Sequence, residues 1–185
     1  DPNPDVSEAT TGTGTSIWPD LTSNIRLTQD WGHLQLAGIL RDITYDPVVG
    51  SRSTEAGWGL NFAGQVMFFK PVAKGQQDNV TFQAAGGKGI ANYFNDTSGL
   101  GLDAFANANN TLDTLNIWGG FVAYQHFWCP GWASVVGASY LHVDDTADQP
   151  ADTYKSGQYF VANVMWYPTD RVWLGVEGLY GIRED

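Results

Sequence analysis

The feature that most constrains this chain is a set of eight segments in which apolar and polar residues alternate over the length of a membrane-crossing β-strand. The segment that begins at Arg171 has the clearest pattern, because one of its faces holds only apolar residues, tyrosine and glycine while the other holds Glu177 and Arg183. A strand spans a bilayer in about 9–11 tilted residues, with lipid on the outside of the barrel and a polar lumen inside. The pattern therefore predicts an all-β protein, a transmembrane antiparallel up-and-down β-barrel.

The turns and loops between these segments alternate in length. We expect the strands at about 21–30, 32–43, 57–68, 79–91, 116–128, 132–143, 157–167 and 171–183. Residues 1–20 have no periodicity and predict a lead-in loop, so the barrel segment comprises residues 21–185. The longer loops fall at 44–56, 92–115 and 144–156, which is typical of barrels with short periplasmic turns and long external loops.

The composition agrees with a membrane barrel. Charged residues make up 16% of the chain, against roughly 25% in soluble domains, and aromatic residues make up 14%. No apolar run approaches the ~18 residues of a membrane helix. The net charge of -11 argues against a nucleic-acid partner, whose phosphates require Lys and Arg. The single cysteine, Cys129, has no Cys or His at a metal-ligand spacing, and we expect neither a metal nor a cofactor.

The aromatic residues gather near both ends of the expected strands. Those beside the short turns are Trp31, Phe68, Phe69, Trp128, Trp132, Trp166 and Tyr167. Those toward the long loops are Trp58, Tyr93, Phe94, Trp118, Tyr140 and Tyr180. Amphipathic rings prefer the headgroup level of a membrane, so the two groups predict two girdles. A secreted sandwich or a soluble barrel stays open as the alternative, because alternation alone does not distinguish them.

The same alternation predicts which residues face the lumen. The pore-lining candidates are Arg26, Arg41, Asn61, Gln65, Gln83, Arg171, Glu177 and Arg183. In the longest loop, the candidates for a constriction or an external cap are Tyr93, Asp96, Asp103 and Asn107. Lys88 has the parity of the lipid-facing residues, so either a bulge at Gly86-Gly87 shifts the register or Lys88 lies above the hydrocarbon. The faces of 116–128 and 132–143 stay open, because both faces are largely apolar.

Three stretches carry a family resemblance. They run from Pro19 to Arg41, from Trp118 to Trp128 and from Tyr180 to Glu184, and in order and spacing they resemble the DcaP-like porins. The resemblance implies a diffusion channel of the bacterial outer membrane, a homotrimer of 16-stranded barrels in contact with lipid and lipopolysaccharide. It covers the C-terminal half of such a barrel. We therefore expect about eight strands here as part of a larger barrel, with more strands before Asp1 and a final strand after Asp185.

The leading functional hypothesis is a porin for passive diffusion of small hydrophilic solutes. Lumenal arginines attract anions into a low-dielectric passage, and the family resemblance likewise implies negatively charged, dicarboxylate-like solutes. The arginines in question are Arg26, Arg41, Arg171 and Arg183. Each has an equally good structural interpretation as the partner of a lumenal carboxylate such as Glu177.

Two other functions stay open. One is a small outer-membrane enzyme of the lipase or deacylase type, with His126, Ser134 or Ser139, and Glu177 as candidates, although no Gly-x-Ser-x-Gly motif is present. We expect no enzyme activity. The other is a structural membrane anchor with a plugged lumen. Loop-bound Ca²⁺ at Asp144, Asp145, Asp148 and Asp152 competes with the simpler interpretation of a solvated acidic loop.

Overall fold

The computed structural model describes residues 6–8, 12–48, 50–107, 111–145, 149, 152–169 and 171–185. Twelve strands and one short 3-10 helix are present in these residues. They are β1 (Val6–Glu8), β2 (Gly12–Thr15), β3 (Leu21–Gln29), β4 (Gly32–Pro47), β5 (Ser53–Met67), β6 (Asn79–Lys88), η1 (Ala91–Tyr93), β7 (Ala104–Ala106), β8 (Leu112–Thr114), β9 (Asn116–Cys129), β10 (Trp132–Val143), β11 (Ser156–Thr169) and β12 (Val172–Glu184).

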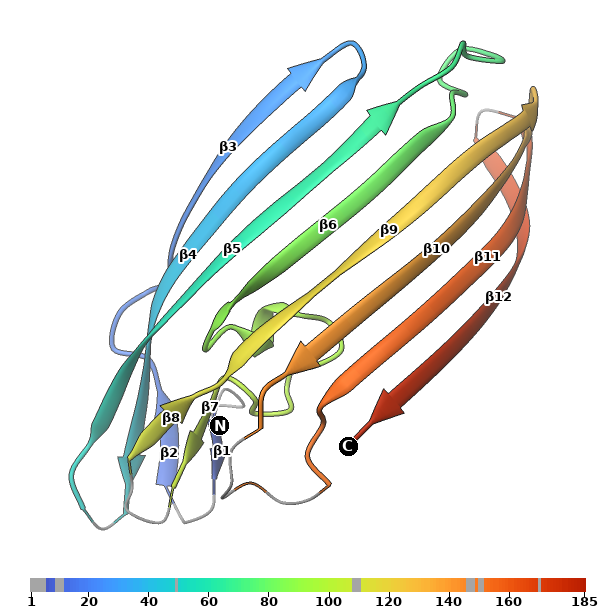
Figure 1. Ribbon diagram of the computed structural model, residues 1–185. Helices are drawn as coiled ribbons and strands as arrows, with labels where there is room; N and C mark the ends of the chain where they lie inside the picture. The colour runs from blue at the N-terminus through green and yellow to red at the C-terminus, as the bar shows by residue number, and fades with distance from the viewer. Residues whose placement is uncertain are drawn as a thin grey trace.

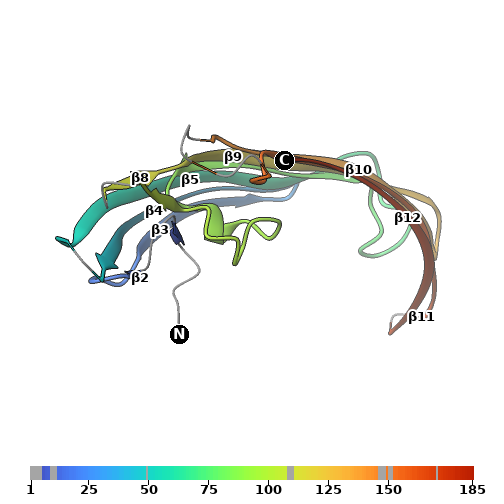
Figure 2. The same ribbon diagram turned by 90° about the horizontal axis from the view of Figure 1, so that it is seen from below.

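The long strands form one antiparallel sheet (Figure 1). The order is β12-β11-β10-β9-β6-β5-β4, and β2 and β3 pair in succession with the same side of β4. Every pairing between described residues 21–183 is antiparallel and joins consecutive strands of this sheet or of the loop hairpin β7–β8, which confirms the predicted meander. Seen from below, the sheet is a curved, open arc (Figure 2), and among the described residues β3 does not pair with β12.

The two faces of the arc differ in chemistry. The outer face presents large apolar side chains to the surroundings: Leu60, Phe62, Leu174 and Val176 are 55%, 44%, 56% and 80% exposed. In a β-sandwich these side chains would be buried against a second sheet. Their exposure on a sheet of alternating pattern is the arrangement of a barrel wall that faces lipid.

The longest loop folds against the concave face, near the ends of the strands that meet the long loops (Figure 2). Its residues form η1, β7 and β8, and β1 joins β7 in the one parallel pairing of the described strands. Ile90, Leu102 and Leu115 pack against the inward side chains of β9 and β10, and Leu112 packs near Ile43 and Tyr45 of β4. The loop therefore has a small hydrophobic core of its own with the wall.

Two segments differ from the expected loops. The prediction of a loop over 44–56 is wrong over most of its length, because β4 continues to Pro47 and β5 begins at Ser53. The hairpin is longer than expected because Ile43 and Tyr45 are buried against the longest loop, in one hydrophobic cluster with Leu112. Within residues 1–20, expected as a lead-in, β1 and β2 form short pairings. Asp42 accepts hydrogen bonds from the backbone N–H groups of Ile17 and Trp18, both at 2.8 Å, where the chain passes from β2 to β3.

The girdles are largely as expected. Trp132 stacks on Trp166 beside the short turns, with ring centroids 5.9 Å apart, and Trp118 packs on Tyr140 toward the long loops at 5.1 Å. Tyr93 and Phe94 are exceptions, because they belong to the inner loop and line cavities on the concave face. Lys88 pairs with Trp58 and no register shift interrupts β5 and β6, so the bulge is excluded and Lys88 lies on the outer face at the end of its strand.

Candidate functional site: the concave face beneath the inner loop

Side chains of directly paired residues share a face of the sheet, so the register assigns the inner face strand by strand. Gln83 pairs with Phe121, and Phe121 pairs with Ser139, which settles the parity of β9 and β10. Eight carboxamides fall on the inner face: Asn24, Gln35, Asn61, Gln65, Asn79, Gln83, Gln125 and Asn163. The polar side chains of the described inner face are thus mainly neutral hydrogen-bonding groups, and β9 and β10 also carry small and apolar residues there.

Arg41 is on the inner face but is covered by the loop. Its side chain is only 4% exposed, and one guanidinium nitrogen lies 2.5 Å from a carboxylate oxygen of Asp103. Asp20 lies 3.5 Å from the guanidinium, and the ring of Tyr93 lies 5.5 Å away. Arg41 therefore anchors the loop to the wall. Asp103 and Asp20 largely neutralise its positive charge, so Arg41 contributes little to the electrostatic potential in the lumen.

Asp103 and Tyr93 complete this anchor. Asp103 is fully buried, and its second carboxylate oxygen accepts the backbone N–H of Asn92 at 2.9 Å. The hydroxyl of Tyr93 donates to Asp20. Partial burial, followed by this hydrogen bond and the Asp20 charge, raises the pKa of Tyr93 to about 12. The phenol stays protonated, so the contact between the loop and the start of β3 persists over a wide pH range.

The other charged pore-lining candidates lie apart from one another. Arg26 is on the inner face of β3 opposite Gln35. Glu177 accepts a hydrogen bond from Asn163 at 3.2 Å, and Arg183 bonds Asp185 at 2.6 Å with its guanidinium over the ring of Tyr154. Arg171 lies in the turn before β12, outside the strand in which it was expected.

The loop candidates take different places. Asp96 and Tyr93 both line a cavity on the concave face, whereas Asp103 is buried and pairs with Arg41. Asn107, which follows β7, donates to Asp113 of β8 at 3.3 Å. Sequence reasoning missed Asp20, Phe121 and Tyr159. Alternation could have found the two aromatic residues, but no sequence signal links Asp20 to Arg41.

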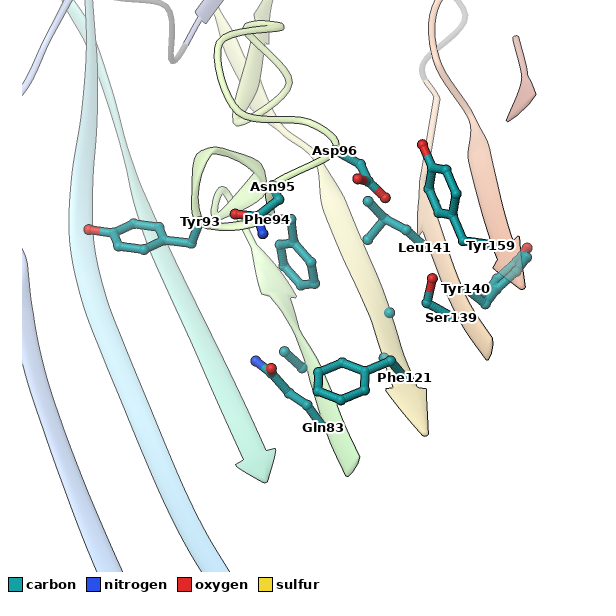
Figure 3. Close-up of a pocket in the computed structure, with 13 residues that line it drawn as sticks. Gln83, Tyr93, Phe94, Asn95, Asp96, Phe121, Ser139, Tyr140, Leu141 and Tyr159 are labelled. Carbon is teal, nitrogen blue, oxygen red and sulfur yellow. The ribbon is translucent and has the colours of Figure 1, made fainter. Parts of the chain in front are cut away.

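Two cavities flank the Tyr93-Phe94 segment on the concave face. The first cleft has a volume of about 420 Å³ and lies toward β9, β10 and β11 (Figure 3). The second cleft, of about 270 Å³, lies toward β3, β4 and β5. Both are lined by Gln83, Ala85, Tyr93 and Phe94, so this segment forms a ridge between them.

The residues considered for an enzyme are not brought together. His126 and Ser134 pair on the outer face, whereas Ser139 and Glu177 are on the inner face. His126 lies 2.6 Å from Asp78, which also accepts hydrogen bonds from Tyr124 and from the Phe127 N–H. The hydroxyl of Ser134 accepts a hydrogen bond from Trp128 at 3.0 Å. No hydrolytic constellation of His126, a serine and Glu177 forms.

The acidic loop holds no metal site in the described part of the chain, where no group of three or more His, Cys, Asp or Glu residues converges. Asp144 lies 3.3 Å from His142, and Asp145 lies 3.7 Å from Lys155. Asp148 lies outside the described residues. Among those residues, no helix is long and apolar enough to cross a membrane.

Comparison with known proteins gives a match in structure and none in sequence. No family model and no curated protein sequence matches the chain. The crystal structure of the outer membrane channel DcaP of Acinetobacter baumannii matches with a TM-score of 0.74 and 17% sequence identity. The match covers 97% of this chain and 51% of that chain, so this chain spans about half the length of that channel. The chain therefore has the fold of about half of an outer-membrane channel barrel.

Proposed function

We propose that this chain forms part of the wall of a porin, a passive diffusion channel of the bacterial outer membrane for small hydrophilic solutes. One observation carries the proposal: a curved sheet exposes large apolar side chains on its outer face, gathers its carboxamides on the inner face and holds a folded loop against that inner face. Lipid outside and water inside require this division. An inner loop that narrows the passage supplies a place for selectivity.

The open arc bears on the size of the barrel. β3 and β12 each leave one edge unpaired among the described strands. Within hydrocarbon, each unsatisfied backbone group costs several kcal/mol, so a spanning sheet must close. We propose that further strands complete the barrel, to 16 in total, and that the barrels assemble as a homotrimer in contact with outer-membrane lipid and lipopolysaccharide.

An anion preference is the finer part of the proposal. Arg26, on the inner face, and Arg171, in the turn before β12, carry the positive charge that this preference requires. Arg183 contributes less, because it forms an exposed ion pair with Asp185 at 2.6 Å, and Arg41 contributes little, because it is buried and neutralised by Asp103 and Asp20. Most of the acidic residues lie in loops. With a Debye length of about 8 Å at physiological salt, the more distant carboxylates are screened from an ion at the ridge, where Asp96 is the acidic residue that lines the first cleft. Small anions such as dicarboxylates would then permeate more readily than cations.

The test is the reversal potential of the complete channel in a planar bilayer under a salt gradient. We expect anion selectivity in the wild type and a shift toward cations in Arg26→Ala and Arg183→Ala. The control is Arg52→Ala, which removes an exposed arginine paired with Asp46 beyond the hairpin end and should leave the potential unchanged. Cation selectivity of the wild type, or an equal shift in the control, would contradict the anion filter. A bilayer without conductance would favour a structural anchor with a plugged lumen.

A further inference from the structure

We propose that the two clefts beside the Tyr93-Phe94 ridge bind an uncharged polyhydroxylated solute, of the chemical class of carbohydrates. The proposal rests on the porin function and names the solute that such a channel would hold at its ridge. Clefts of about 420 Å³ and 270 Å³ are of the size of small-ligand sites or slightly below it. The residues that line the two clefts determine which class of ligand they can bind.

The polar lining is neutral apart from Asp96. Asn24, Gln35, Asn61 and Gln83 line the second cleft, and none of its described lining residues is Lys, Arg, His, Asp or Glu. Gln83, Asn95 and Ser139 line the first cleft, where Asp96 is the one acidic residue and no basic residue is present among the described lining residues. A carboxamide donates and accepts hydrogen bonds side by side, which matches the paired donor and acceptor character of a sugar hydroxyl.

The carboxamides beneath the ridge differ from those nearer the short turns. Gln65 donates to Asn79 at 3.1 Å and Asn79 donates to Gln125 at 3.0 Å, so that group satisfies itself. In the described structure the carbonyl oxygen of Asn61 is buried and has no hydrogen-bond partner. A buried acceptor without a donor is destabilising, and a hydroxyl that enters the second cleft would relieve it. Hydrogen-bonding capacity is therefore left open where the loop narrows the passage.

Aromatic rings provide the second half of such a site. Phe121 and Tyr159 line the first cleft with 40% and 38% of their surfaces exposed, on the same inner face as the carboxamides. Figure 3 shows Phe94 extending from the loop toward Gln83 and Phe121. The C–H groups of a sugar ring carry partial positive charge and stack on the negative face of an aromatic ring. Ring faces beside carboxamides thus suit a pyranose better than a linear ion.

Charge argues against an ion as the preferred ligand. An anion in the first cleft would be repelled by Asp96, and the buried guanidinium of Arg41 is already paired with Asp103. An organic cation could interact with the rings and Asp96, but the second cleft offers it no carboxylate. The features common to both clefts are carboxamides and rings, and these recognise a neutral solute.

The experiment measures how maltotriose interrupts the ion current of the complete channel in a planar bilayer, with succinate and choline as charged comparators. We expect maltotriose to reduce the current in a saturable manner. Phe121→Ala and Gln83→Leu should each raise the half-blocking concentration by about tenfold, the effect of losing one stacking or hydrogen-bonding contact. The matched control, Phe160→Ala, removes a phenylalanine from the outer face of β11 and should leave the block unchanged.

The outcomes separate this inference from the porin function. Three results would overturn the inference without contradicting the porin function. They are an ion current that maltotriose does not block, equal block in all variants, and block by succinate or choline at lower concentration than by maltotriose. Absence of any ion current would instead contradict the porin function itself. Isothermal titration calorimetry with maltotriose in detergent gives a binding measurement that does not depend on conductance, and absence of binding there would also overturn the inference.

Discussion

At the scale of single residues, the pairing of Arg41 with Asp103 has the largest consequence. The two residues are separated by 62 positions in sequence and meet with both side chains almost completely buried. Alternation correctly places Arg41 on the inner face, but it contains no information on a partner in a distant loop. Alternation therefore predicts Arg41 as a pore-lining residue, whereas in the structure Arg41 attaches the inner loop to the wall.

Asp103→Ala should detach the loop from the wall. Removing one partner of a buried ion pair leaves an uncompensated charge and typically costs about 3–5 kcal/mol, of which Asp20 would recover a part. We expect proteolytic cleavage within residues 91–115 to become at least about tenfold faster, since about 1.4 kcal/mol is a factor of ten. Asp113→Ala, at an exposed position of the same loop, should have little effect. Equal cleavage rates in the two variants would rule out the anchor.

We expect the hydrogen bonds that Asp78, just before β6, accepts from β9 to be sensitive to acid. Burial, the largest influence, raises the pKa of Asp78, but hydrogen bonds from the Phe127 N–H, His126 and Tyr124 together outweigh it and lower the pKa below 3.8. A lowered pKa in the folded state stabilises the protein above the unfolded-state pKa, and this stabilisation is lost as the pH falls through the folded value.

We expect the urea unfolding free energy in detergent to stay level from pH 7 to about pH 5 and to fall below about pH 4, in the window set by the reference value of 3.8. Asp78→Asn should be less stable than the wild type at pH 7 by about 2 kcal/mol, the typical strength of a hydrogen bond to a charged group. The same variant should lose less stability on acidification. Parallel pH profiles for the two proteins would contradict the assignment to Asp78.

At the scale of elements, the eight long strands are all predictable from the sequence. Alternation predicts six of them, while β9 and β10, whose two faces are both largely apolar, are predicted from their tight turn and flanking aromatic residues. β1, β2, β7 and β8 are not, since a strand of three or four residues is too short to show a period. Their position depends on tertiary contacts, such as the packing of Leu112 near Ile43 and Tyr45. The same contacts extend the β4–β5 hairpin into residues 44–56, where the sequence predicts a loop.

The turn between β9 and β10 offers a test at this scale. Gly131 has φ = +83°, in the left-handed region, and donates its N–H to Gln76 at 2.9 Å. Gly131→Ala should destabilise the protein by roughly 1–2 kcal/mol, because L-residues are strained in this conformation. The control is Gly178→Ala on the outer face of β12, where an added Cβ meets no atom within 4 Å. Urea unfolding in detergent measures both, and equal losses would contradict the turn assignment.

At the scale of the whole molecule, the girdles define how the barrel sits in a bilayer. Trp31, Trp128 and Trp132 lie beside the short turns and are 40%, 66% and 42% exposed, while Trp58 and Trp118 lie toward the long loops at 49% and 53%. Rings at these positions belong at headgroup level. In vesicles of brominated lipid, bromine near the headgroup should quench tryptophan fluorescence more than bromine at the chain end. Stronger quenching from the chain end would contradict this orientation.

The neutrality of the second cleft has a consequence for the conditions under which a channel of this kind could work. Its hydrogen-bonding groups are carboxamides and hydroxyls, and the one titratable group among the described lining residues is Tyr93, whose pKa is about 12. Neither acid nor mild alkali changes the charge of such a surface. A recognition site made of amides would keep the same affinity in an acidic medium as in a neutral one, even where the ionic selectivity of the rest of the passage varies.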